Sequence, residues 1–232
     1  MMEVLKVTDL DVSYGESKII NSVSLTLFDN ESVALMGRNG MGKTTLIKAL
    51  IGLLPSQSGS ICINSVEISQ LPSHKRVEAG MGYVPQGRMI FPYLTVEENL
   101  LAGLEAVEEK VVPDFVYEVF PVLKEMRNRR GGNLSGGQQQ QLAIGRTLVS
   151  RPKVFLLDEP TEGIQPSIIK DIAQTLNVLK GELGFSLLVA EQALSFALEV
   201  ADRFAIIERG QIVHEATRAD VDEAEIRSYL TI

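Results

Sequence analysis

The sequence predicts an α/β fold in which a mostly helical insert interrupts a core of alternating strands and helices. Two observations support this prediction. An apolar strand pattern at 32–36 leads through a glycine-rich loop into a helical pattern from residue 45. Patterns at about 95–150 are mainly helical, and strands and helices alternate again from residue 152. We therefore expect one domain, 1–232, with its core at 1–86 and 151–232 and a helical subdomain at about 87–150.

The amino-terminal part is predicted to be rich in β structure. Val4–Val7 and Val23–Leu27 alternate apolar and polar residues, as half-buried strands do. Ser32–Met36 has the continuous apolar character of a buried strand. Ser58–Ser60 is expected to turn into another strand, and Gly82–Val84 leads into a Pro-Gln-Gly segment.

The insert and the carboxy-terminal part follow. Thr95–Glu98 has the pattern of a capping box at a helix start. Pro113 and Pro121 fit helix beginnings, and Gly131–Gly132 breaks the helical pattern. The alternating elements beyond them are expected at Lys153–Leu157, Ser167–Lys180, Phe185–Ala190, Ala193–Val200, Phe204–Ile207 and Gln211–Val213.

The composition is that of an ordinary globular protein, with 45% hydrophobic residues. No apolar run approaches the roughly 18 residues that span a bilayer, and the amino terminus lacks the regions of a signal peptide. We expect a cytosolic protein that reaches a membrane only through a partner. The net charge of −8 argues against a nucleic-acid partner. The basic cluster of Arg127, Arg129 and Arg130 fits a solvated helix end better than a binding patch.

The single cysteine and the two histidines offer little chemistry. Cys62 cannot form an internal disulfide, which fits a reducing compartment. Its strand-like surroundings predict a small core residue. His74 and His214 lie far apart without ligand spacing around them, so we expect no metal site from protein side chains alone.

The run Gly37–Thr44 is a glycine-rich phosphate loop that ends in Lys-Thr between a strand and a helix. Glycines let the backbone curl so that successive N–H groups point at phosphate oxygens, and the helix start adds its positive dipole end. Lys43 is expected to reach the outer phosphates, and the Thr44 hydroxyl to ligate Mg²⁺. The alternative is an ordinary glycine-rich turn from strand to helix.

Two further motifs carry charge or anion-binding groups. An apolar strand ends in Asp158 and Glu159, which suits a parallel sheet whose ligand edge holds carboxylates. Asp158 can position the Mg²⁺ shell and Glu159 can polarise the attacking water. The alternative is a buried strand with charges where it surfaces. Leu134–Gln138 reads Leu-Ser-Gly-Gly-Gln before a helical run, so Ser135 can cap that helix and the glycines can admit an anion. The alternative is a helix cap without a ligand.

The order of these motifs resembles the ATP-binding-cassette (ABC) ATPases over nearly the whole chain. The resemblance implies an ABC-type P-loop NTPase domain with an antiparallel amino-terminal β subdomain, a helical insert, ATPase activity, and ATP and Mg²⁺ as cofactors. It implies that Tyr14 stacks on adenine, although a core strand aromatic is the alternative. It implies catalysis by Lys43, Glu159 and Gln192 and metal contacts from Thr44, Gln86 and Asp158. The implied nucleotide contacts are Tyr14, Gly37, Arg38, Asn39, Gly40, Gly42, Lys43, Thr44, Thr45, Gln86, Ser135, Gly136, Gly137 and Gln138.

Two segments depart from the common pattern of that family. Gln192 stands where the family usually has a histidine that touches the γ-phosphate, and an amide cannot carry positive charge. The alternative for Gln192 is an ordinary polar residue at a helix start. The segment after the acids, Pro160–Pro166, replaces a Ser-Ala-Leu-Asp type loop. Both departures resemble importers of branched-chain amino acids and urea, and further stretches are most similar to urea-transporter ATP-binding subunits: Tyr14–Ser17, Arg88–Pro92, Arg129–Gly132, Gln138–Leu142 and Thr161–Ile169.

The resemblance implies an ATP-hydrolysing subunit that powers solute import, with urea as the substrate and branched-chain amino acids as the alternative. Two other classes compete: a soluble ABC ATPase outside transport, and a non-catalytic nucleotide-binding module. The implied partners are a second ABC ATPase in a homo- or heterodimer, two membrane permeases docked near Arg88–Leu94, and indirectly a substrate-binding protein. The implied location is peripheral, on the cytoplasmic face of a bacterial membrane. Each motif occurs once, so two chains must meet head to tail if the Leu134–Gln138 site completes the phosphate loop.

Overall fold

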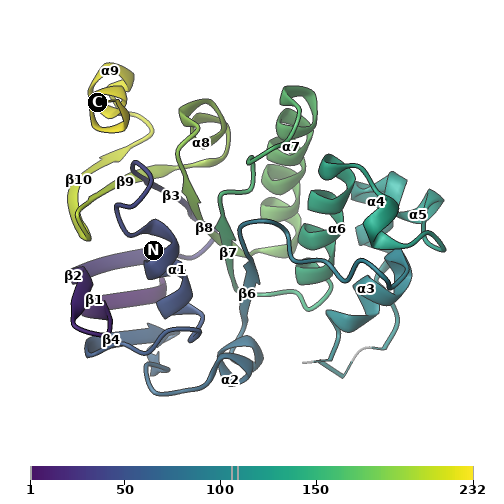
Figure 1. Ribbon diagram of the computed structural model, residues 1–232, viewed down its shortest axis with the longest axis horizontal. Coiled ribbons are helices and arrows are strands. Elements are labelled where there is room, and N and C mark those ends of the chain that lie inside the picture. Colours follow the sequence, from purple (N-terminus) through teal and green to yellow (C-terminus); the bar gives the residue numbers. More distant parts are fainter. Residues whose placement is uncertain (1, 106, 109, 232) are drawn as a thin grey trace.

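A computed structural model describes residues 2–105, 107–108 and 110–231, so the two ends of the expected 1–232 domain lie outside the described residues. The strands form two sheets, which confirms the predicted α/β class (Figure 1). One is antiparallel, with the order β2-β1-β4-β5, and the other is mixed, with the order β10-β9-β3-β8-β7-β6. The strands are β1 (Glu3–Tyr14), β2 (Ser17–Phe28), β3 (Ser32–Met36), β4 (Ser58–Ile63), β5 (Val66–Glu67), β6 (Met81–Val84), β7 (Val154–Asp158), β8 (Ser186–Glu191), β9 (Arg203–Glu208) and β10 (Gln211–Thr217).

The antiparallel sheet is built by the expected alternation. Along β1 the residues Leu5, Val7, Leu10 and Val12 are buried, and their neighbours mostly face out. The same alternation in β4 corrects the prediction for Cys62. Ile61 and Ile63 point into the core, so the cysteine between them lies on the other face and is partly exposed.

The central strands of the mixed sheet are buried on both faces because structure covers each side. Strand β3 lies parallel between β8 and β9, and β7 lies parallel between β8 and β6. Successive residues of β7 enter different cores: Val154 and Leu156 pack with the antiparallel sheet, and Phe155 and Leu157 pack on the opposite side. The mixed sheet is therefore a wall shared by two hydrophobic cores.

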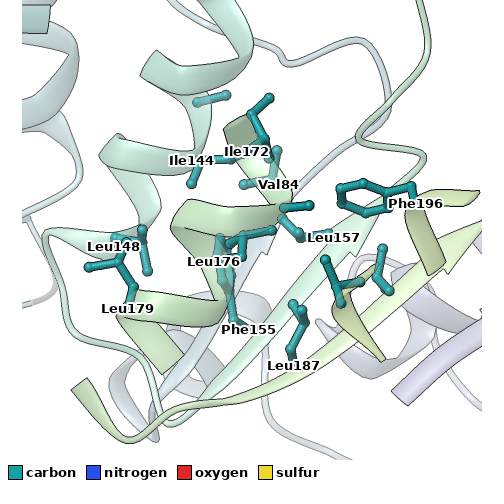
Figure 2. Close-up of a cluster of buried hydrophobic side chains, with 14 of the residues drawn as sticks. Val84, Ile144, Leu148, Phe155, Leu157, Ile172, Leu176, Leu179, Leu187 and Phe196 are labelled. Carbon is teal, nitrogen blue, oxygen red and sulfur yellow. The ribbon is translucent and has the colours of Figure 1, made fainter. Parts of the chain in front are cut away.

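Helices are divided between these two cores. Helix α1 packs with the antiparallel sheet, while α6, α7 and α8 cover the other face of the mixed sheet. Figure 2 shows that second core, where Leu176 of α7 lies at Phe155 of β7 and Leu179 lies beside Leu148 of α6. The helices are α1 (Lys43–Leu50), α2 (Ser73–Glu78), α3 (Val96–Ala102), α4 (Asp114–Val119), α5 (Pro121–Glu125), α6 (Gly136–Leu148), α7 (Pro166–Leu183), α8 (Leu194–Val200) and α9 (Glu223–Leu230), with a 3₁₀ turn, η1, at Gly131–Asn133.

The elements agree with most of the sequence expectations. The capping box at the start of α3 is present, with Thr95 as N-cap and Glu98 bonding back to it. Pro113 and Pro121 stand at the starts of α4 and α5, as predicted. The short elements β5 and α2 and the terminal helix α9 were not predicted, and β10 runs four residues beyond the expected Val213. Among the described helices, none combines the length and apolarity that a bilayer crossing needs.

Candidate functional site

The phosphate loop connects β3 to α1 at the carboxyl end of β3, a central strand of the mixed sheet. Its shape requires glycine at two positions, because Gly40 and Gly42 have φ angles of 82° and 110°. A side chain at Gly42 would in addition lie 2.9 Å from Ile20. The left-handed residue at position 42 is the N-cap of α1, so the loop delivers its backbone directly to a helix start.

Lys43 is held inside the curl of this loop. Its side chain is 3% exposed, and Nζ donates to the carbonyl oxygens of Gly37 at 2.7 Å and Arg38 at 3.2 Å. The same ammonium group lies 3.3 Å from Oε1 of Glu159. The loop therefore presents one desolvated positive charge at its centre, where an anion would sit.

Thr44 and Asp158 form the other half of the loop's polar lining. The Thr44 hydroxyl donates to Oδ1 of Asp158 at 2.9 Å. Asp158 is 1% exposed, and within the described chain its Oδ2 has no hydrogen-bond partner. A buried carboxylate oxygen without a donor, beside a hydroxyl oxygen, is a donor set that suits a hard cation such as Mg²⁺. The residues present therefore fit the metal that the sequence implied.

Burial dominates the protonation of Asp158. Desolvation raises the pKa of its carboxyl group to about 6, and the nearby Glu159 charge adds to the rise. The hydrogen bond from Thr44 and the charges of Lys48 and Lys43 lower the pKa, but by less than desolvation raises it. A bound cation would compensate the charge that burial penalises.

Glu159 occupies a strained backbone position immediately after β7. Its φ angle of 46° is left-handed, and its N–H donates to the carbonyl oxygen of Ala190 at 2.8 Å, which ties it to β8. Its carboxylate lies between two donors. Oε1 faces the Lys43 ammonium at 3.3 Å, and Oε2 accepts from Nε2 of Gln86 at 3.0 Å. Strain that neighbouring strands maintain is typical of a functional position.

Gln86, just beyond β6, reaches the two acidic residues that follow β7. Its Nε2 donates to Glu159 at 3.0 Å and to Oε2 of Glu162 at 3.1 Å. The structure thus brings together the predicted residues Lys43, Thr44, Gln86, Asp158 and Glu159. The contribution of Glu162 was not predicted, because nothing in a lone acidic residue indicates which amide it meets in the fold.

Tyr14 lies at the mouth of the same site and is 48% exposed, which rules out the alternative of a core aromatic. It lines a pocket of about 260 Å³ together with Ile19, Gly40, Gly42, Lys43, Thr44, Thr45 and Glu159. An exposed aromatic ring beside a phosphate loop is available for stacking on a base. The lining residues do not include any residue of Leu134–Gln138.

The Leu-Ser-Gly-Gly-Gln segment forms the start of α6, the helix that packs in the core shown in Figure 2. Ser135 caps the helix as expected: its hydroxyl accepts from the Gln138 N–H at 3.4 Å. Gln138 completes a capping box, since its Oε1 accepts from the Ser135 N–H at 2.9 Å. Ser135 is exposed, and Gly136 and Gly137 are partly so. The side chain of Gln138 thus bonds to the Ser135 backbone, which the sequence did not predict.

Gln192 is exposed and lies between β8 and α8. The residue before it, Glu191, is 3% exposed and was not singled out by the sequence. Its Oε1 accepts from the N–H groups of Gln192 at 2.8 Å and Ala193 at 3.0 Å, and its Oε2 accepts from the Thr161 hydroxyl at 2.8 Å. Glu191 therefore connects the backbone at Gln192 to the segment that follows Glu159.

A phosphate loop that follows a central parallel strand, a buried acid beside the Thr44 hydroxyl and a second acid beside the loop lysine are the pattern of a nucleoside-triphosphatase of the P-loop class. The family model described as ABC transporter matches residues 20–162. The chain belongs to the ABC transporter family, as its ATP-hydrolysing, ATP-binding subunit.

Relatives with assigned names cover most of this chain. The chain is 42% identical over 209 residues to the high-affinity branched-chain amino acid transport ATP-binding protein BraG of Pseudomonas aeruginosa, covering 89% of each. It is 37% identical to the lipopolysaccharide export system ATP-binding protein LptB of Haemophilus influenzae, over 99% of this chain and 98% of the relative. A probable branched-chain amino acid transport ATP-binding protein, LivF of Archaeoglobus fulgidus, is 34% identical over 96% of this chain and 95% of its own length.

Solved structures have the same fold. A nucleotide-free ATP-binding cassette from an ABC transporter superposes with a TM-score of 0.84 at 27% identity, over 99% of this chain and 95% of the other. The ADP conformation of an ATP-binding cassette gives a TM-score of 0.83 at 28% identity, with the same coverage of 99% and 95%. The structure is thus an ABC cassette: α/β, with an antiparallel amino-terminal sheet and a mixed core sheet.

Proposed function

We propose that this ABC transporter ATPase energises the import of branched-chain amino acids. The 42% identity to BraG supports this substrate, and the 34% identity to LivF, also described as a branched-chain amino acid transport protein, adds to it. Urea is the second candidate, because the stretches quoted above, including Thr161–Ile169, resemble urea-transporter subunits. LptB, which is named for lipopolysaccharide export, is 37% identical: this is less than BraG and more than LivF, over a larger share of the chain than either.

The site residues have separate roles in the proposed hydrolysis. Lys43 and the loop N–H groups hold the β- and γ-phosphates, and Tyr14 stacks on adenine. Mg²⁺, held by Thr44, Asp158 and Gln86, would neutralise phosphate charge when bound. Glu159 orients a water molecule and takes its proton as the water oxygen attacks the γ-phosphorus and the bond to ADP breaks. Catalysis is then mostly positioning and charge stabilisation.

The proposed working unit contains two such subunits. Ser135 is exposed, Gly136, Gly137 and Gln138 are partly exposed, and none of the residues Leu134–Gln138 lines the phosphate-loop pocket of its own chain. We infer that it faces the γ-phosphate of ATP held by a second ABC ATPase, identical or related. ATP then joins the two subunits, and hydrolysis loosens the dimer by removing that contact.

The ATPase role is tested with Glu159→Gln. Loss of a general base slows hydrolysis by ~10²–10⁴-fold, and the ATP-bound dimer should persist longer on size-exclusion chromatography. Lys43→Ala is the companion variant, because it should lose nucleotide binding as well as turnover. Unchanged turnover in Glu159→Gln would remove that residue from the proposed role.

The substrate is tested by uptake in a strain that lacks this gene. Labelled leucine and labelled urea are supplied in parallel, and the gene is restored as wild type or as Glu159→Gln. We expect loss of leucine uptake, recovered by wild type alone. Loss of urea uptake with normal leucine uptake would select the second candidate.

We propose that the permeases dock on a groove between the core and the helical subdomain, placing the subunit peripherally on the cytoplasmic face of the membrane. A pocket of about 410 Å³ is lined there by apolar residues that include Leu53, Met89 and Phe91. Phe91 is 47% exposed, and the Arg146 guanidinium stacks on its ring at 5.0 Å. Arg146 also donates to the Met89 carbonyl oxygen at 2.9 Å, so the exposed apolar loop is held in place.

Docking is tested by co-purification with the permeases after Phe91→Ala. We expect most of the association to be lost while basal ATPase activity remains, because the ring does not line the phosphate-loop pocket. Val178→Ala is the matched control, since Val178 is an exposed apolar residue of α7 outside this groove. Full association of the Phe91→Ala variant would count against this docking surface.

A further inference from the structure

Gln86 directs one nitrogen atom at two carboxylates. Its Nε2 lies 3.0 Å from Oε2 of Glu159 and 3.1 Å from Oε2 of Glu162. An ionised carboxylate can only accept hydrogen bonds, and the two hydrogens of an amide are both on its nitrogen. The two acids therefore dictate which end of the Gln86 amide faces them.

The remaining end of that amide is its carbonyl oxygen, which is the only kind of atom Gln86 can offer to a hard cation. A glutamine side chain has nearly the same shape in either orientation, so hydrogen-bond partners must choose between them. With a single carboxylate acceptor, the second hydrogen of the Gln86 amide would have no protein partner. With two acceptors, the orientation of the amide group about the last side-chain bond is fixed. Glu162 supplies the second acceptor.

The backbone that carries Glu162 is itself anchored. Nη2 of Arg88 donates to the carbonyl oxygens of Glu162 at 3.1 Å and Gly163 at 3.4 Å. The guanidinium group lies against the start of α6, where a side chain on Gly136 would meet its nitrogens at 3.3 Å. Arg88 therefore holds the Glu162 segment against both the Gln86 loop and α6.

The alternative for an exposed glutamate is an ordinary solvated surface acid. The geometry argues against this alternative, because Glu159 and Glu162 both accept from the same amide nitrogen. Two neighbouring carboxylates repel each other, and the shared donor offsets part of that repulsion. Glu162 also lies in the segment that departs from the common Ser-Ala-Leu-Asp pattern, and a serine there would have a shorter side chain whose hydroxyl can also donate.

We propose that Glu162 is a positioning residue that fixes the amide of Gln86, with its NH₂ group toward Glu159 and its carbonyl oxygen kept for the cation. This inference rests on the proposed function, because it presumes a cation at Thr44 and Asp158. Glu162 does not itself touch nucleotide or metal. Its effect passes through Gln86 alone.

The test measures Mn²⁺ binding by electron paramagnetic resonance in the full-length protein with a non-hydrolysable ATP analogue. Glu162→Ala should weaken Mn²⁺ binding by about 10-fold, the size usual for a partner that orients a metal ligand. Glu162→Gln should stay close to wild type, because its amide oxygen still accepts from Gln86. In parallel ATPase assays, Glu162→Ala should lower kcat with little change in the KM for ATP.

A double-variant comparison decides whether the effect passes through Gln86. Glu162→Ala should cause no further loss of Mn²⁺ affinity in a Gln86→Ala background. Glu118→Ala, at an exposed position on α4, is the control for removal of a surface acid. Unchanged affinity in Glu162→Ala, an added loss in the double variant, or a Glu162→Gln variant as weak as Glu162→Ala would each overturn the inference. Failure of wild type to bind Mn²⁺ with the analogue would instead refute the proposed function.

Discussion

At the scale of single residues, the site contains ionisable side chains whose charged forms are penalised by burial. Asp158 is nearly inaccessible, yet one of its carboxylate oxygens has no partner among the described residues. The buried ammonium group of Lys43 donates to carbonyl oxygens of its own loop, and these hydrogen bonds offset part of its desolvation cost. Such groups cost stability in the absence of ligand and favour binding of an ion or phosphate that compensates them.

This cost predicts how stability depends on pH when nucleotide and metal are absent. The pKa of Asp158 rises from 3.8 to about 6 on folding, so the native state binds its proton more readily than the unfolded chain between about pH 4 and 6. The free energy of unfolding therefore falls as pH rises through this window, by up to about 3 kcal/mol from this group. Asp158→Asn should remove that fall.

The measurement is urea unfolding of wild type and Asp158→Asn at pH 5 and pH 7. We expect the free energy of unfolding of Asp158→Asn, relative to that of wild type, to be higher at pH 7 than at pH 5. Asp171→Asn, at an exposed position on α7, controls for loss of a carboxylate. An advantage that is equal at both pH values would show that Asp158 titrates normally.

Residues whose chemistry is local in sequence could be predicted, and residues defined by long-range contacts could not. Lys43 and Thr44 lie in one contiguous motif, and Asp158 follows an apolar strand, so their neighbours in sequence indicate their surroundings. Glu191 and Arg146 act through partners 30 and 57 residues away. No pattern in one sequence gives such distances. Cys62 shows the same limit, since strand membership does not say which face a residue occupies.

At the scale of elements, local capping signals shape the surface that we propose for docking. Thr95 and Glu98 cap α3, and the buried Asn99 in the same helix holds the preceding loop. Its amide donates to the carbonyl oxygens of Phe91 at 3.0 Å and Leu94 at 3.3 Å, and its Oδ1 accepts from the Phe91 N–H at 2.8 Å. The start of this short helix therefore determines the conformation of an exposed loop.

Thr95→Ala should reduce the free energy of unfolding by about 1 kcal/mol, because it leaves the Glu98 N–H without its side-chain acceptor. Thr95→Ser retains the hydroxyl and should stay near wild type. Thermal or urea unfolding measures both. Equal stability of Thr95→Ala and wild type would mean that water replaces the cap without cost.

Elements with strong signals were the ones predicted. The α3 capping box and the buried strand β7 combine several local preferences, and the structure confirms them. Helix α9 was missed although Asp222 caps it, because the helix is short and its apolar side consists of Ile226, which is buried, and Tyr229 and Leu230, which are only partly buried. β5 spans two residues, too short for any periodic pattern.

At the scale of the whole molecule, the chain order and the spatial order of the mixed sheet differ. Strand β3, which carries the phosphate loop, lies between β8 and β9, more than 150 residues later in sequence. The helical insert separates them in the chain but shares a hydrophobic core with α7 and α8. The strand that carries the phosphate loop is therefore held on both sides by strands from the carboxy-terminal part of the chain.

This arrangement has a consequence for biosynthesis. A nascent polypeptide emerging from the ribosome exposes the phosphate-loop strand with both of its edges vacant until residues 186–208 have been translated. Nascent chains arrested with residues 1–184 outside the exit tunnel should not retain a fluorescent ATP analogue, whereas chains with 1–217 outside should. Until late in translation, β3 is therefore an unpaired apolar strand of the kind that chaperones bind.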